Sequence, residues 1–172
     1  MAPQPDSSFD VTFGRSVAAR LPAVTAGLAM AGAGLLHLVL APAHAEHSVP
    51  HATALFLVGV IDIVWAATWA SRQSARVLWS GLFLTLLTIG LYTISRFLPL
   101  PFEGHPEEVE PLGLTTQTLE ALAFVSLATV LFVARGVGRW RALATCAGLA
   151  FASSWIVFGA ASLAASVMGE GA

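Results

Sequence analysis

The sequence predicts an all-α protein, a bundle of five membrane-spanning helices, and three observations predict it. Of 172 residues, 56% are hydrophobic and only 10% are charged, whereas soluble domains carry about 25% charged residues. Several apolar runs approach the roughly 20 residues that a helix needs to cross a bilayer. Seven of the eight arginines, the only cationic side chains, flank these runs in a pattern that fits alternating spans. A four-span bundle is the alternative.

The apolar runs give the predicted elements in order. A flexible segment, 1–14, rich in polar residues and proline, precedes a single bundle at 15–168. The predicted helices cover about 21–41, 52–70, 77–98, 114–134 and 142–167, with outer loops at 42–51 and 99–113.

Prolines and small residues justify these limits. Pro42 marks the end of the first helix or a kink in it, and Pro99 ends the third, since the residue before a proline disfavours helical geometry. In the first helix Gly27, Ala31 and Gly34 recur at a spacing that lets helix backbones approach closely in lipid.

Five tryptophans are expected mostly at the membrane interfaces: Trp65, Trp69, Trp79, Trp140 and Trp155.

The distribution of charge predicts the orientation. The seven arginines fall before the first helix, between the second and third, and between the fourth and fifth. The positive-inside rule makes that side, with the N-terminus, cytoplasmic. All five histidines and the acidic 99–113 loop then face outward from a bacterial inner membrane, with the lipid bilayer as the main partner.

Composition also excludes several classes. The single cysteine, Cys146, excludes an internal disulfide and a site built on paired cysteines. No basic cluster predicts a nucleic-acid partner. Because the sequence carries no hydrolytic triad, phosphate loop or dinucleotide motif, it favours a non-enzymatic protein over an enzyme.

Four strongly polar side chains lie inside predicted spans: His37, Asp62, Arg96 and Glu120. Ionisable groups at membrane depth are costly, so they face the bundle interior and pair, or mark a functional site. At about 1.5 Å of rise per residue, three of them share one layer near the outer face, and Asp62 forms a floor beneath it.

We therefore expect an outward-facing His/Glu/Arg pocket with the chemistry of a transition-metal site. Imidazole and carboxylate ligands suit zinc, copper, iron or manganese, of which we expect copper, zinc or iron. The candidate metal ligands are His37, His44, Glu46, His51 and Glu120, and the polar network around them comprises Asp62, Tyr92, Arg96, Glu110 and Gln117. The acidic loop is expected to fold over the pocket as a lid through Glu103, Glu107, Glu108 and Glu110.

Other interpretations stay open. One alternative is a ligand-free network that fixes helix orientation through His37, Arg96 and Glu120. The protein would then be a structural or accessory subunit of a larger membrane complex, or a homo-oligomer. Haem needs two axial imidazoles from facing helices, and only His37 lies clearly within a span. A quinone site using His37 and Glu120, and a small transporter using Asp62 and Glu120, are further alternatives.

Two stretches carry a resemblance. HLVLAPAH, 37–44, resembles an HL-x3-P-x-H run in a group of small bacterial polytopic membrane proteins without an assigned function. SRFLPLPFEGHPEEVEPLG, 95–113, is similar to their arginine, Pro-Phe and Glu-Pro-x-Gly loop, and Glu120 matches a glutamate on their next helix. The resemblance implies a membrane architecture over the first four helices and supplies no function.

Overall fold

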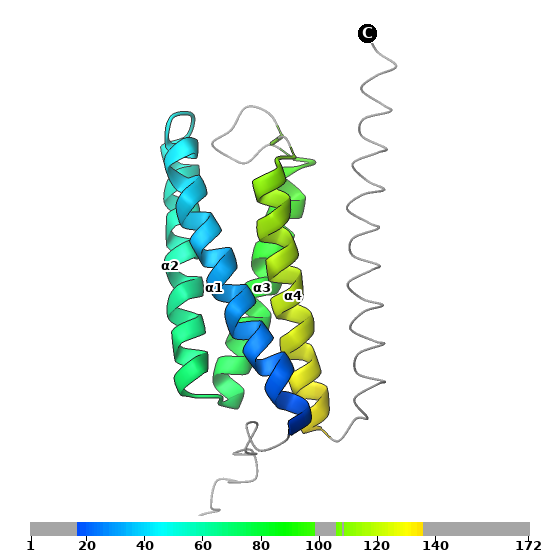
Figure 1. The fold of residues 1–172 in the computed structure, drawn as a ribbon. Coiled ribbons are helices and arrows are strands. Elements are labelled where there is room, and N and C mark those ends of the chain that lie inside the picture. The colour runs from blue at the N-terminus through cyan, green and yellow to red at the C-terminus, as the bar shows by residue number, and fades with distance from the viewer. Residues whose placement is uncertain (1–16, 99–105, 108, 136–172) are drawn as a thin grey trace, which may run out of the picture.

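Four long helices, arranged up and down, form the part of the chain that the structure describes. A computed structural model describes residues 17–98, 106–107 and 109–135. The helices are α1 (Val17–Ala45), α2 (Val49–Ser71), α3 (Ala75–Ser95) and α4 (Pro111–Ala134), and within these ranges there is no strand (Figure 1). The predicted all-α class is confirmed for these residues.

Each of the four helices is long and apolar enough to cross a membrane. The count equals the alternative of four spans, and the described residues give no support for a fifth. The predicted span at 142–167 and the flexible segment at 1–14 lie outside the described residues. The chain is thus a multi-pass helical bundle whose apolar helix surfaces suit contact with lipid.

The turn between α1 and α2 is shorter than the predicted 42–51 loop. Helix α1 continues through Pro42 to Ala45, and only three residues, 46–48, separate it from α2. Pro42 has no N–H, so one helical hydrogen bond is forgone, which membrane helices tolerate. Ser48 then caps α2, its Oγ accepting from the His51 backbone N–H at 3.4 Å.

The other connections also differ by a few residues. Helix α3 ends at Ser95, three residues before the predicted limit, and α4 begins at Pro111, three residues earlier than predicted. Proline suits a first helical position because its missing N–H would be unpaired there anyway. The connection from α3 to α4 therefore covers 96–110 instead of 99–113.

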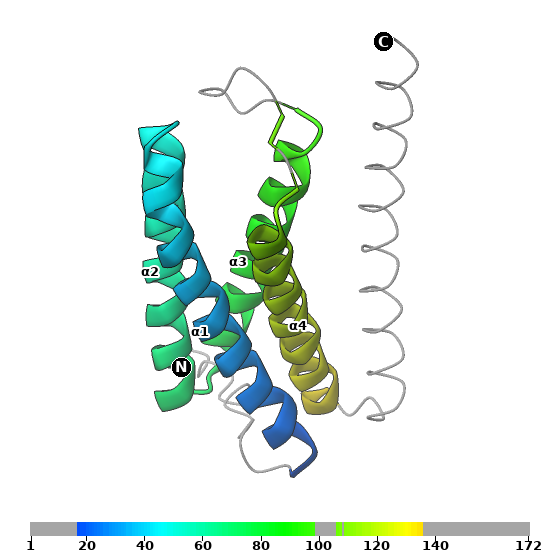
Figure 2. The ribbon, with the colours of Figure 1, turned by 45° about the horizontal axis from the view of Figure 1, so that its top comes forward.

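Helix α1 crosses the bundle diagonally. It packs mainly against α2 and α4, whereas α2 and α3 touch less (Figures 1 and 2). The crossing with α2 is close at Gly34 and Gly59: a Cβ on Gly59 would lie 2.7 Å from the Gly34 carbonyl oxygen. A Cβ on Gly34 would lie 2.9 Å from the Asp62 Cβ. Glycine at both positions therefore lets Asp62 lie directly against α1.

Two tryptophans are core residues, contrary to the expected interfacial position. Trp65 and Trp69 are 7% and 1% exposed, and their rings stack with centroids 5.5 Å apart. The Trp69 indole donates to the Ala23 carbonyl at 2.8 Å. Their N–H groups find carbonyl acceptors inside the bundle, which removes the need for an interfacial position.

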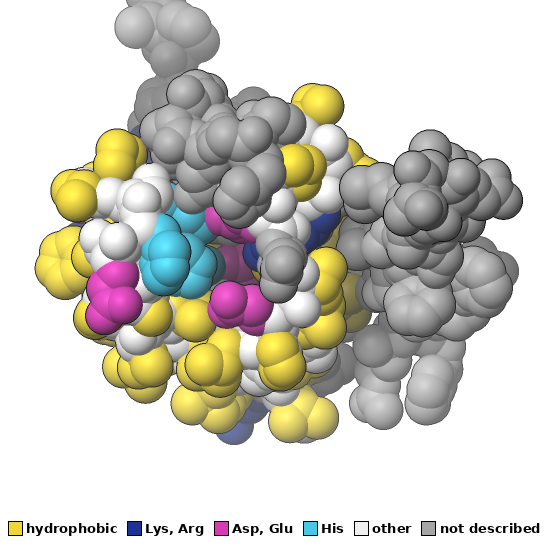
Figure 3. All heavy atoms as spheres, turned by 90° about the horizontal axis from the view of Figure 1, so that it is seen from above, with side chains coloured by type: hydrophobic (Ala, Val, Ile, Leu, Met, Phe, Trp, Pro, Cys, Tyr) yellow, Lys and Arg dark blue, Asp and Glu magenta, His cyan; other side chains and the backbone are white. Residues whose placement is uncertain are grey.

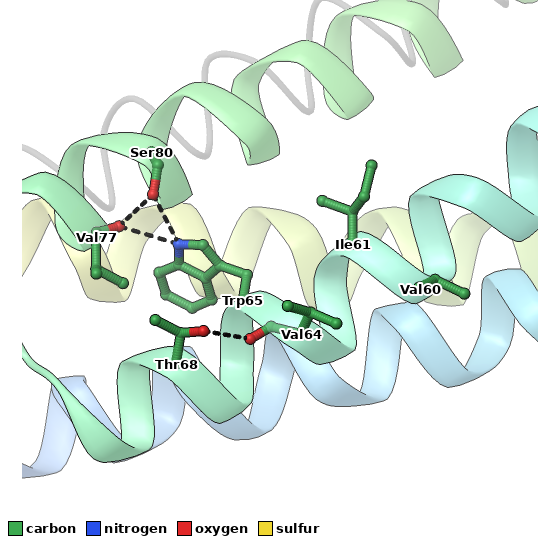
Figure 4. A pocket seen from close by; sticks show the side chains of 7 residues that line it. All are labelled: Val60, Ile61, Val64, Trp65, Thr68, Val77 and Ser80. Carbon is green, nitrogen blue, oxygen red and sulfur yellow. Dashed lines mark hydrogen bonds between the residues drawn. The ribbon is translucent and has the colours of Figure 1, made fainter.

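The Trp65 indole reaches from α2 to the first turns of α3. Its N–H donates to the Val77 carbonyl at 3.0 Å and to the Ser80 hydroxyl at 3.2 Å (Figure 4). Its ring lies against Gly81. The shallow groove beside it on the outer surface of the bundle is lined mainly by apolar side chains, namely Val60, Ile61, Val64, Trp65, Thr68, Val77 and Ser80.

The two ends of the bundle differ in charge. The end that holds the α1–α2 turn carries the described histidines and is called the histidine end. The opposite end, called the arginine end, carries Arg20, Arg72, Arg76 and Arg135. Of the described arginines, Arg96 alone lies at the histidine end, as the sequence predicts.

Candidate metal centre

Polar side chains gather in the middle of the histidine end. Viewed from above that end, histidine side chains lie near acidic ones, with hydrophobic side chains along much of the visible edge (Figure 3). They form two groups, each with three side chains whose ligand atoms all lie within 4.8 Å of one another. Where the sequence predicted one pocket, the structure therefore has two groups at different depths.

The deeper group, called the inner triad, consists of His37, Asp62 and Glu120, one residue each from α1, α2 and α4. The His37 Nε2 atom lies 2.8 Å from Glu120 Oε1 and 4.0 Å from Asp62 Oδ2. Asp62 and Glu120 are 1% and 2% exposed. The predicted floor residue is thus part of the group that contains His37, because the glycine crossing brings α2 close to α1.

The shallower group, called the outer triad, consists of His44, His51 and Glu107. The His44 and His51 rings meet edge to face with centroids 4.5 Å apart. The His51 Nδ1 atom lies 2.7 Å from Glu107 Oε1. His44 is seven residues from His37 on α1, so the two triads are about 10 Å apart along the helix axis.

Glu107 is held from three sides. The Arg96 guanidinium lies 3.2 Å from Glu107 Oε2, and the Ser95 hydroxyl donates to the same oxygen at 3.1 Å. The Glu107 backbone N–H donates to the Ser95 carbonyl at 3.0 Å. These contacts fix the carboxylate at the end of α3, from where it reaches His51 on α2.

The surroundings of Glu107 favour its charged form. Burial is the largest single influence and raises the pKa of Glu107. Four influences lower it: the hydrogen bond from His51, the charge of His51, the charge of Arg96 and the hydrogen bond from Ser95. Together these four outweigh burial. The pKa of Glu107 falls from an ordinary 4.5 to about 2. The carboxylate is therefore negatively charged at neutral pH, as a metal ligand must be.

Other predicted site residues lie outside the two triads. Glu46 is exposed in the turn, and Glu110 is exposed at the start of α4, where its side chain makes no cap hydrogen bond. Arg96 lies over the Tyr92 ring at 4.2 Å and contacts Glu107. Gln117 is half-buried one turn before Glu120. Neither glutamate therefore joins a ligand group, whereas Arg96 supports one.

Sequence reasoning included Glu107 only as part of an acidic lid. Glu107 lies beside His51 at the histidine end, whereas Glu103 and Glu108 lie outside the described residues, so the lid stays a prediction. Four glutamates in one loop look alike in the sequence. Glu107 follows Arg96 by eleven residues, a spacing that suits a loop returning to the end of its own helix. The neighbouring glutamates have similar spacings, so the spacing does not single out Glu107.

Comparisons with protein-family models, curated proteins and solved structures found no match. The chemistry of the two triads therefore carries the functional argument.

Proposed function

We propose that this protein binds a transition-metal ion at the outer triad. The observation that carries the proposal is the convergence of two imidazoles and one carboxylate, with ligand atoms within 4.8 Å of one another. Metal–ligand bonds of about 2.0–2.2 Å would bring such atoms to about 3.4 Å of one another. Side-chain shifts of about 1 Å are enough. Two imidazoles with a carboxylate suit zinc, copper or iron.

The support around the ligands favours this reading. The His44 Nδ1–H donates to the Leu40 carbonyl at 3.1 Å, so a neutral imidazole presents its lone pair at Nε2. Metal-binding histidines commonly have their second nitrogen held in this way. Glu107 has one oxygen held by Arg96 and Ser95, and its other oxygen faces His51.

A purely structural ion-pair network accounts for less of this geometry. It explains Glu107 with Arg96 and His51, which ties the α3–α4 connection to α2. It gives no role to His44, whose ring lies against His51 and whose orientation is fixed by Leu40. Because the structural network explains the contacts of Glu107 but not those of His44, an accessory subunit without a ligand is the second candidate.

Binding is favoured over transport because the bundle closes beneath the triads. Trp65 follows Asp62 by three residues on α2, and Trp69 follows by seven. Their stacked rings belong to an apolar core with Met30, Leu78 and Leu127. This core lies between the triads and the arginine end. A permeating ion needs polar partners along its path, and an apolar core offers none.

We further propose that the histidine end faces outward from a bacterial inner membrane. Arginines at the opposite end support this orientation through the positive-inside rule. The outer triad then meets metal ions of the periplasm or the medium.

Equilibrium dialysis of the detergent-purified protein against Zn²⁺ tests the function. We expect the double variant His44→Ala/His51→Ala to bind one ion fewer per chain than the wild type. The matched control is His47→Ala, which removes an exposed histidine from the same turn and is expected to bind as the wild type does. Equal zinc binding by the double variant and the wild type would overturn the proposal.

A further inference from the structure

We propose that the inner triad is a second metal site, distinct from the outer one, that selects a harder divalent cation such as Mn²⁺ or Fe²⁺. His37, Asp62 and Glu120 come from three different helices and place their ligand atoms within 4.8 Å of one another. The proposal does not depend on zinc binding at the outer triad, because the two groups share no residue.

Burial without partners is the first argument. Both Asp62 carboxyl oxygens and Glu120 Oε2 are buried and have no hydrogen-bond partner among the described residues. A buried polar group without a partner costs about 1–3 kcal/mol, more when it is charged. Two such carboxyl groups aimed at one imidazole need an explanation, and a shared cation satisfies all three open oxygens.

The geometry around His37 is the second argument. Its Nε2 atom faces both carboxyl groups, at 2.8 Å from Glu120 Oε1 and 4.0 Å from Asp62 Oδ2. In the described part of the chain, the ion pairs of these two carboxyl groups involve His37 alone. An ordinary buried ion pair would bring one cationic side chain to one carboxylate, whereas here one imidazole faces two.

Charge balance is the third argument. Two carboxylates, a neutral imidazole and a divalent cation sum to zero, which suits a site within membrane-spanning helices, where net charge is costly. In the outer triad a single carboxylate already contacts the Arg96 guanidinium. The inner triad therefore compensates a divalent charge better than the outer one.

The ligand set gives the selectivity. Carboxylate ligands suit manganese and other hard cations, whereas imidazole suits zinc and copper. The inner triad has two carboxylates and one imidazole, and the outer triad has the reverse. We therefore expect Mn²⁺ to prefer the inner triad.

Further polar groups line the way between the triads. Gln117 lies one turn before Glu120 on α4, and Tyr92 lies one turn before Arg96 on α3. The Gln117 Nε2 and Tyr92 hydroxyl groups are buried without a partner in the described part of the chain. Gly113 gives the Tyr92 ring room, since a Cβ there would lie 3.2 Å from it. Buried polar side chains outside the triads therefore occur on both α3 and α4 in this half of the bundle.

Paramagnetic resonance of Mn²⁺ added to the purified full-length protein tests the proposal. Free Mn²⁺ gives a six-line signal that is lost on binding. We expect the wild type to remove about one Mn²⁺ per chain from the free pool, and His44→Ala/His51→Ala to do the same. We expect Asp62→Asn/Glu120→Gln, which keeps the shapes of both side chains, to bind Mn²⁺ at least about 100-fold more weakly, since changes even to supporting groups cost 10–100-fold.

Two results would overturn the proposal. One is a free Mn²⁺ signal that the wild type leaves unchanged, which needs no variant to interpret. The other is Mn²⁺ binding that survives Asp62→Asn/Glu120→Gln and is lost in His44→Ala/His51→Ala. The difference in zinc binding between the wild type and His44→Ala/His51→Ala reports on the outer triad separately, so failure of one site is distinguishable from failure of the other.

Discussion

Glu107 shows how one residue organises the histidine end. One carboxylate oxygen contacts Arg96 and Ser95 and the other contacts His51. Glu107 therefore joins the end of α3 to the start of α2, two helices that touch little elsewhere. The same contacts that fasten the connection also orient a ligand oxygen toward His51.

The lowered pKa of Glu107 gives a pH prediction for the metal-free protein. Its pKa is 4.5 when unperturbed and about 2 in the fold. A group with a depressed folded pKa stabilises the fold above its unfolded pKa, and this contribution is lost as pH falls toward the folded value. With a chelator present, we expect the wild type to exceed Glu107→Gln in melting temperature at about pH 5, where the Glu107 carboxylate is mostly charged in the folded and unfolded states. The margin should begin to shrink below about 4.5.

Glu110→Gln is the control, because Glu110 is exposed at the start of α4. The melting temperature of Glu110→Gln should equal that of the wild type at every pH tested. A Glu107 margin that disappears well above pH 4.5, or one that does not shrink at all below it, would contradict the assigned contacts.

Several individual positions could be predicted from the sequence. Depth along a helix placed His37 and Glu120 in one layer, and they lie 2.8 Å apart. Arg96 was expected near Glu120, yet the carboxylate that it contacts is Glu107. Helical periodicity assigns depth only within helices, so it carries no information on where a loop residue folds back.

At the scale of elements, the crossing of α1 and α2 positions the inner triad. Gly34 and Gly59 let the two backbones approach, and Asp62 lies directly beside this contact. The small-residue stripe predicted on the first helix is confirmed at Gly34, whereas a Cβ on Gly27 would meet Trp69 at an ordinary 3.4 Å. Of the two glycines in the stripe, only Gly34 is therefore required for the close approach.

Gly59→Ala tests this crossing. The added methyl would lie 2.7 Å from the Gly34 carbonyl oxygen, and overpacking of this kind costs about 1–3 kcal/mol. We expect a lower melting temperature in detergent and weaker Mn²⁺ binding. Gly90→Ala is the matched control, since a Cβ there meets nothing within 4 Å. Equal melting temperatures and equal Mn²⁺ affinities for the two variants would refute the role of the crossing.

Helix existence was predictable and helix limits were less so. Apolar runs located all four helices, because lipid-facing and core-facing positions are both apolar. Limits depend on capping, and Ser48 and Ser74 each accept from the backbone N–H three residues on. A serine before Val-Pro-His at 49–51 is a recognisable start signal, which hydrophobicity alone does not detect.

The whole molecule is polar along its axis. Among the described residues, the histidines and most acidic groups lie toward one end, four arginines lie at the other, and a tryptophan-containing apolar core lies between. The sequence predicts this polarity because alternating spans assign each connection to a side. It does not predict two triads, since their separation depends on α1 continuing through Pro42 and on the fold of the connection after α3.

Cysteine labelling tests the orientation. In a Cys146→Ser background, His47→Cys and Ser71→Cys place single thiols at exposed positions of the histidine and arginine ends. An impermeant maleimide added to intact cells should label His47→Cys and should reach Ser71→Cys only after permeabilisation. The reverse pattern would place the arginine end outside.

The most direct test of the central claim is the metal content of the wild-type protein, measured by plasma mass spectrometry after saturation with Zn²⁺ and Mn²⁺ together and removal of unbound ions. The two triads predict two metal ions per chain in total. Retention of neither metal, in protein that remains folded and monodisperse, would contradict the account and leave the polar groups as a network that fixes helix packing.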